Sequence, residues 1–158
     1  MLLVSVEVRE FDRGTLIVGP RGRYFCRFGR SGLLAAIADG RLTVDMCDAI
    51  PKLYDKAGTA GEQVTAFVDA TRVSAVDAAL VEKASEWVKR RATPVMTHAL
   101  VRSKLIELSF TMLNMVTRRS VAELYTDEAR FLLAARREWI AFTMPTFPAE
   151  VTTQAAIK

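Results

Sequence analysis

The side chains that could carry out chemistry in this chain are few and widely separated. His98 is the only histidine, and it lies within Pro94–Val101, a run that is apolar on both faces, as a buried strand is. Acid–base catalysis needs a partner group and an open pocket, so we interpret His98 as a hydrogen-bonded core residue. Cys26 and Cys47 lack a metal-ligand spacing and are expected to be small buried thiols in a reducing compartment.

Motifs of catalysis and cofactor binding are also missing from the sequence. The chain contains no G-x-S-x-G, H-E-x-x-H or C-x-x-C motif and no glycine-rich phosphate loop. We therefore predict that the protein is not an enzyme and that it holds neither a metal nor a cofactor. Its function is expected to come from binding.

The segment Val68–Val81 carries two aspartates at positions that could serve binding. Its pattern predicts a buried strand that ends at Asp69, then a short loop, then the start of a helix. Ser74 and Asp77 fit a capping box, whereas a helix that begins at Asp77 itself would use that carboxylate as the N-cap. Both starts stay open, and both give Asp77 a capping role.

This segment resembles the phosphoacceptor loop of the STAS family, which includes the anti-sigma-factor antagonists. In that family the loop closes with Asp-Ser-Ser-Gly or Asp-Ser-Thr-Gly. The acceptor hydroxyl lies at a helix N-terminus, where free N–H groups and the helix dipole favour a phosphate. The matching run here is Asp77–Leu80 (DAAL), in which Ala78 and Ala79 replace the hydroxyl residues. The chain therefore resembles a degenerate branch that lacks the phosphoacceptor serine.

The resemblance covers about two-thirds of the chain, from Leu33 to about Arg136. Leu33–Tyr54 matches the family's early strand, turn and first helix, and Arg102–Phe131 matches its third helix, its final strand and the start of its last helix. The alternation of strands and helices also favours an α/β fold. We expect a STAS-like mixed sheet of about five to six strands with helices packed on it, plus an N-terminal β-hairpin.

We divide the chain into three parts of one domain: residues 1–32 as an N-terminal strand and hairpin extension of the sheet, residues 33–137 as the STAS-like core, and residues 138–158 as an apolar tail. Within the core, Leu33–Ala38 is expected to be a central strand. Thr43 can cap a helix that runs to about Lys56. Pro51 inside that helix should kink it or leave the bond to Cys47 unmade.

The helix expected over Ser103–Thr117 has more apolar surface than a core-facing stripe needs. Its apolar residues spread over roughly 220°, against the stripe of about 100° that normally faces a core. Either another element such as the tail covers the excess, or the excess is an interaction face. Met112 and Met115 favour an adaptable partner or an apolar ligand, because methionine repacks easily.

The tail itself is too apolar to float free in water. It carries Trp139, Ile140, Phe142, Met144 and Phe147, and its two prolines prevent the helix from continuing. We expect the tail to pack over the N-terminal hairpin or the 103–117 helix. A second subunit is the other surface it could cover, and the tail would then be the contact of a homodimer.

Basic residues beside aromatics in the hairpin raise the alternative of nucleic-acid binding. Arg23 and Arg27 lie near Tyr24 and Phe28, and the net charge is +4. In a strand, however, alternation places the arginines on one face and Tyr24 and Phe28 on the other, as in an ordinary amphipathic hairpin. The pattern therefore favours a structural hairpin over a nucleic-acid site.

Composition and resemblance together predict a binding protein. The chain is 51% hydrophobic and 25% charged, and no apolar run approaches the length of a membrane span, so we expect one globular domain in the cytoplasm. The resemblance implies a regulatory module for protein–protein interaction in signalling, with a partner of the kinase-like anti-sigma-factor class. The expected docking residues are Asp69, Asp77, Ala78, Ala79, Met112 and Met115. The alternative is a carrier or sensor of a small, lipid-like apolar ligand in a pocket beneath the 103–117 helix.

Overall fold

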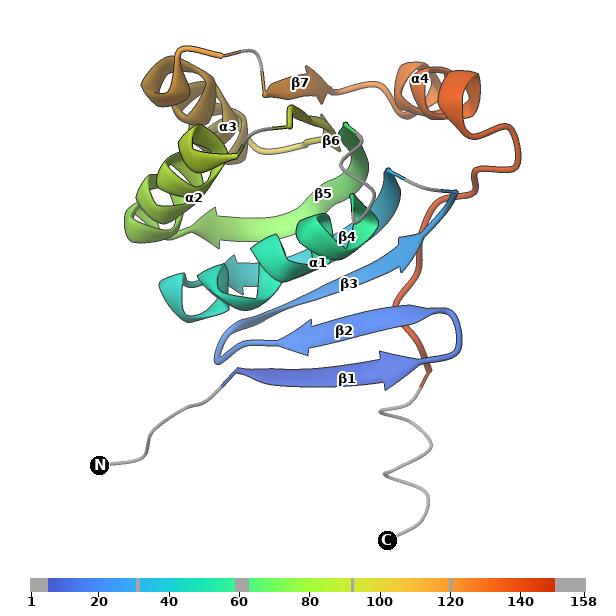
Figure 1. The fold of residues 1–158 in the computed structure, drawn as a ribbon, viewed down its shortest axis with the longest axis horizontal. Coiled ribbons are helices and arrows are strands. Elements are labelled where there is room, and N and C mark those ends of the chain that lie inside the picture. The colour runs from blue at the N-terminus through green and yellow to red at the C-terminus, as the bar shows by residue number, and fades with distance from the viewer. Residues whose placement is uncertain (1–5, 31, 59–62, 92, 120, 150–158) are drawn as a thin grey trace, which may run out of the picture.

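The sheet of this protein contains seven strands among the described residues, and their order in space follows their order in the chain (Figure 1). The computed structural model describes residues 6–30, 32–58, 63–91, 93–119 and 121–149. The strands are β1 (Glu7–Phe11), β2 (Gly14–Val18), β3 (Gly22–Phe28), β4 (Leu33–Leu42), β5 (Val64–Val76), β6 (Val95–Leu100) and β7 (Ala122–Tyr125). The helices are η1 (a 3-10 turn, Val44–Cys47), α1 (Ala49–Ala57), α2 (Ala78–Arg90), α3 (Lys104–Thr117) and α4 (Glu128–Glu138).

The type of connection sets the direction of each strand. Strands β1 to β4 follow one another through short connections and pair antiparallel. Strands β4 to β7 are separated by helices and pair parallel, because a parallel pair needs a crossover connection. The predicted α/β fold with a mixed sheet is confirmed, with seven described strands in place of about five to six, and the predicted hairpin β2–β3 is part of the same sheet.

Strand β5 is much longer than the sequence interpretation allowed. It was predicted to end at Asp69, with a loop before the next helix, but it continues to Val76 and α2 begins immediately after Asp77. The extension alternates as a strand does, with Val73 buried between the exposed residues Arg72 and Ser74. Ser74 therefore lies in the strand, and the predicted capping box between Ser74 and Asp77 is wrong.

Two bulges give β5 more residues than the stretch of β4 with which it pairs. Between the pairs Ile37↔Asp69 and Asp39↔Arg72, β4 advances by two residues and β5 by three. A second shift follows one pair later, between Gly40 and Arg41. Each extra residue bends the strand and increases its twist. Strand β6 stops pairing at Asp69, so the rest of β5 is paired with β4 on one side only.

The segment between β4 and β5 forms two short helices in place of the single predicted one. Thr43 precedes η1, but its side chain makes no capping hydrogen bond. Asp48 separates η1 from α1, so Pro51 falls in the first turn of α1, where a helix N–H has no intrahelical partner to lose. Proline has no N–H, so the bond from position 51 to Cys47 is unmade, as predicted, but the single helix expected from Thr43 to Lys56 is divided at Asp48.

Alternation along the strands divides the interior into two faces. On β4, the even-numbered residues Leu34, Ala36 and Ala38 belong to the core under α1, α2 and α3. The odd-numbered residues of the same strand lie in two clusters on the opposite face, with α4 and the C-terminal segment. Figure 1 shows α1 in front of the sheet and the segment after α4 running behind β3, β2 and β1.

The described part of the tail packs on the sheet of the same chain. Packing over the N-terminal hairpin was one of the two arrangements predicted within the domain. The Phe142 side chain is 1% exposed and contacts the rings of Phe67 and Phe131, with centroid distances of 5.7 and 6.1 Å. Arg27 of β3 donates to the carbonyl oxygen of Thr143, and its guanidinium lies over the ring of Trp139. The described part of the tail, residues 139–149, thus packs on the hairpin side of the sheet.

Candidate functional site

The predicted docking residue Asp69 lies within β5 and is buried. Its Oδ1 atom accepts hydrogen bonds from the backbone N–H of Thr71 at 3.0 Å and from the Thr71 hydroxyl at 2.7 Å. Thr71 lies in the first bulge, where the ladder leaves a backbone N–H without a regular partner. The Asp69 carboxylate therefore accepts the hydrogen bond of a backbone N–H in the bulge. A contact between Asp69 and a partner protein stays a prediction.

The start of α2 holds three more of the predicted residues. Asp77 occupies the N-cap position but makes no side-chain capping bond. Its carboxylate instead accepts from Arg41 Nε at 2.8 Å and from the Val44 backbone N–H at 3.4 Å, which ties β4 and η1 to α2. Ala78 and Ala79 follow and are exposed. Since eight extended residues span roughly 25 Å, the structure does not bring Asp69 together with Asp77.

Helix α3 exposes the apolar surface that its sequence predicted. Ser103 caps the helix by accepting from the Leu105 backbone N–H, as expected for a helix over 103–117. Ile106 faces the core and is fully buried. Five large apolar side chains face outward, with Met115 71% exposed; we call them the α3 face: Leu105, Leu108, Met112, Met115 and Val116. Met112 and Met115 thus lie together, in the second half of the helix.

Cations flank the α3 face at both ends of the helix. Arg102 and Lys104 are exposed at its beginning, and Arg118 and Arg119 are exposed at its end. Among the ion pairs of the described residues, one involves these four cations. It joins Lys104 Nζ to Glu107 Oε2 of the same helix at 3.2 Å. The face is therefore an apolar strip with positive charge at each end.

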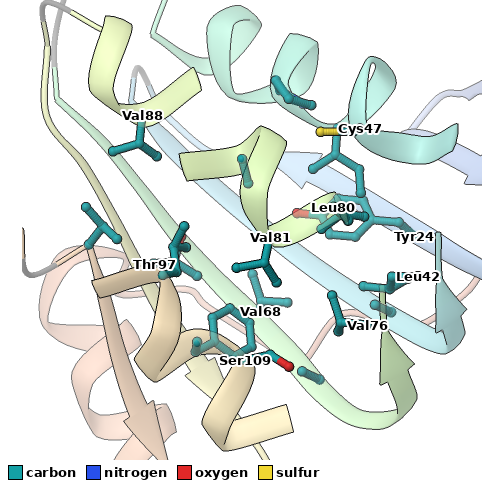
Figure 2. A pocket seen from close by; sticks show the side chains of 18 of the residues that line it. Tyr24, Leu42, Cys47, Val68, Val76, Leu80, Val81, Val88, Thr97 and Ser109 are labelled. Carbon is teal, nitrogen blue, oxygen red and sulfur yellow. The ribbon is translucent and has the colours of Figure 1, made fainter. Parts of the chain in front are cut away.

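An apolar cavity lies on the inner side of α3. It has a volume of about 160 Å³, is partly open to the outside, and lies between the sheet on one side and α1, α2 and α3 on the other (Figure 2). Val73 and Val76, from the extension of β5, line it together with Leu80 of α2 and Phe110 of α3. The sequence predicted a pocket beneath this helix as the alternative to docking. The sequence analysis did not predict that Val73 and Val76 line this pocket, because the extension of β5 was interpreted as a loop.

The hydroxyl groups that line this cavity belong to Tyr24, Tyr54, Thr97 and Ser109. The Tyr54 hydroxyl and the Thr97 hydroxyl lie 3.4 Å apart. The Tyr24 side chain is 4% exposed, and its hydroxyl has no hydrogen-bond partner among the described residues. Burial, and then the proximity of Tyr54, holds the pKa of Tyr24 well above its usual value. Both phenols are therefore protonated near neutral pH.

His98 and the two cysteines pack against other side chains and have structural roles. The His98 ring stacks on Phe67 at 4.9 Å, and its Nδ1 lies 3.0 Å from the Tyr125 hydroxyl. Burial lowers the pKa of His98, with Glu123 acting weakly in the opposite direction. Cys26 and Cys47 are both buried free thiols, and burial raises the pKa of Cys26 to about 12.

The hairpin arginines have partners within the molecule. Arg23 forms an ion pair with Asp39, and its guanidinium lies 4.0 Å from the centroid of the Phe147 ring. Arg27 is engaged by the tail. Both side chains are therefore used to join the sheet to its C-terminal segment, which is the structural alternative predicted for the hairpin.

The part of the chain that the structure describes contains neither a candidate metal site nor a helix that could span a membrane. No cluster of three or more histidine, cysteine or acidic side chains could hold a metal ion there. No described helix is long and apolar enough to cross a membrane.

Comparison with known proteins gives a likeness of fold in outline. No family model and no curated protein matches this chain. An uncharacterized protein of the DUF3478 family with a SpoIIAA-like fold, from Shewanella loihica PV-4, is 15% identical over 85% of this chain and 96% of its own, with a TM-score of 0.48. An anti-sigma factor antagonist from Mycobacterium paratuberculosis is 10% identical over 85% of this chain and 95% of its own, with a TM-score of 0.46. Neither likeness extends to function.

Proposed function

We propose that this protein is a non-enzymatic regulatory module that binds another protein through the α3 face. The observation that supports the proposal is the exposure of five large apolar side chains on one side of one helix. Apolar patches of this kind mark interaction sites in soluble proteins. The two methionines suit a partner whose side chains vary, because a thioether repacks at low cost.

The charges around the face define the chemistry of the partner. Exposed cations stand at both ends of α3, and the helix itself offers one carboxylate, on Glu107. A partner segment with apolar side chains in its middle and acidic side chains at its ends would complement this pattern. An acidic amphipathic helix has that arrangement. Its binding should weaken as salt is raised, because the flanking charges are exposed.

Control of this binding is proposed to be independent of phosphate at the start of α2. Ala78 and Ala79 offer no hydroxyl there, and the Asp77 carboxylate is held by Arg41. An Ala79→Asp change would place a negative charge at the helix start without altering the α3 face. If partner binding is unchanged in this variant, the docking surface is α3 alone and the predicted contribution of Ala78 and Ala79 is lost.

The proposal is tested by cross-linking in the cells that make the protein. A photoreactive amino acid is placed at position 115, and at position 133 as the control, since Leu133 is an exposed apolar residue on α4, 58% exposed against 71% for Met115. We expect one protein to be captured from position 115 and not from 133, and the capture to be lost in a Leu108→Glu background. Equal capture from both positions, or capture that survives Leu108→Glu, would contradict the proposal.

The same measurement addresses self-association. If the captured protein is a second copy of this chain, the partner is a homodimer mate bound through α3. The dimer predicted from the apolar tail would instead be lost when Ile140, which is 89% exposed, is changed to Asp. Sedimentation of the two variants Met115→Glu and Ile140→Asp separates these arrangements.

A further inference from the structure

The cavity under α2 and α3 has the size and lining of a site for a small molecule. Its volume of about 160 Å³ is close to that of engineered apolar cavities of about 150 Å³ in other proteins, which stay dry and bind benzene. Figure 2 shows side chains from the sheet, such as Tyr24 and Val68, and from the helices, such as Val81 and Ser109, gathered around this space. A six-membered ring with one or two further atoms fits such a volume.

One polar atom in the wall is left without a partner. The Tyr24 hydroxyl is buried and makes no hydrogen bond of ordinary length to the described residues. The Tyr54 hydroxyl is its polar neighbour, and Tyr54 also lies 3.4 Å from the Thr97 hydroxyl. A protonated phenol is a hydrogen-bond donor, so the group missing from this wall is an acceptor.

We propose that this cavity binds a small neutral molecule of about six to nine non-hydrogen atoms, apolar except for one acceptor oxygen that receives the hydrogen bond of Tyr24. A ketone, an ester or an ether on a ring or a short chain meets this description. An ion does not, because the lining holds no opposite charge and a buried unpaired charge is costly. Binding here is independent of the docking proposed for the outer face of α3.

The test uses two probes of similar size, cyclohexanone and methylcyclohexane, and follows the methyl signals of the lining valines and leucines by NMR. Both probes should shift these signals in the wild-type protein. Tyr24→Phe keeps the shape and removes the hydroxyl. It should lower the affinity for cyclohexanone about fivefold, the equivalent of one neutral hydrogen bond, and leave that for methylcyclohexane unchanged or higher.

A filled cavity provides the second arm of the experiment. Ala84→Leu, on the cavity side of α2, should abolish binding of both probes while the unfolding transition stays cooperative. Ser109→Leu, on α3, does the same from another helix and replaces the first variant if that one fails to fold. Equal loss of cyclohexanone and methylcyclohexane affinity in Tyr24→Phe would overturn the role of the hydroxyl. Shifts outside the lining, or no binding of either probe, would overturn the site.

Discussion

The two faces of the sheet are built from the same strands but packed in different ways. The face under α4 and the tail is filled by aromatic rings in mutual contact. Phe67 makes three of these contacts, to His98, Phe131 and Phe142, and the rings of His98 and Phe131 in turn contact Tyr125. The face under α1, α2 and α3 is mainly aliphatic, contains a partly open cavity, and carries an exposed apolar helix. One face is therefore suited to hold the fold together, and the other has room to bind.

This difference predicts that stability is concentrated on the α4 face. Phe142→Ala should lower the free energy of unfolding by about 3–5 kcal/mol, because a fully buried phenylalanine leaves a large cavity behind. Urea denaturation followed by circular dichroism measures the loss. Ile140→Ala, two residues away and 89% exposed, is the control and should change stability by less than about 0.5 kcal/mol. A small effect of Phe142→Ala would mean that the tail is not part of the core.

A matched pair of alanines compares the two faces directly. Ala135 is fully buried in α4, and Ala84 lines the cavity from α2. Ala135→Leu should cost about 1–3 kcal/mol, since added methyl groups have no space on the filled face. Ala84→Leu should cost less or stabilise the protein, because its side chain enters the cavity. Equal costs in urea denaturation would remove the distinction between the faces.

The attachment of the tail to β3 depends on Arg27. Arg27→Ala removes the hydrogen bond to the Thr143 carbonyl and the stacking over Trp139, and should cost about 1 kcal/mol. Hydrogen exchange should become faster in residues 139–149, while α3 is unaffected. Arg27→Lys is the informative control, since it keeps the charge but loses the planar guanidinium. If Arg27→Lys behaves as wild type, charge alone holds the tail.

Acid should weaken the filled face by a smaller amount. Burial lowers the pKa of His98 in the folded protein, so between that value and about 6.5 the unfolded chain binds a proton that the folded protein does not. The contribution of His98 to stability is therefore constant above about pH 7 and falls as the pH drops through 6.5. His98→Gln should remove this slope in thermal unfolding measured from pH 7.5 to 5.5. A slope that persists in the variant would assign it to other groups.

The sequence predicted some of these features because their signals are local. Helix α3 follows from its cap at Ser103 and its apolar periodicity, and the packing of the tail follows from Trp139 and Phe142 being too apolar for water. The extension of β5 was missed although Arg72, Val73 and Ser74 alternate as a strand does, because resemblance to a family loop outweighed the period of the side chains. The break at Asp48 and the bulges of β5 depend on contacts between distant segments, which no local pattern contains.

The cavity could not be predicted from the sequence for a related reason. Its lining comes from four strands, three helices and the 3-10 turn, and each of its residues has the pattern of ordinary core in its own segment. Tyr24 is an example, since in the hairpin it is simply the apolar side of an alternating strand. Only the assembled structure shows that its hydroxyl is buried without a described partner.

The bulges of β5 also bear on how this protein could change over time. At each bulge β5 has one residue more than β4. One residue corresponds to a single codon in the gene. Insertion or deletion of one codon at Thr71 or Ser74 would alter how far β5 reaches past β6, and with it the depth of the floor under α2. The capacity of the cavity is thus open to evolution by changes of chain length, without any substitution among the side chains that line it.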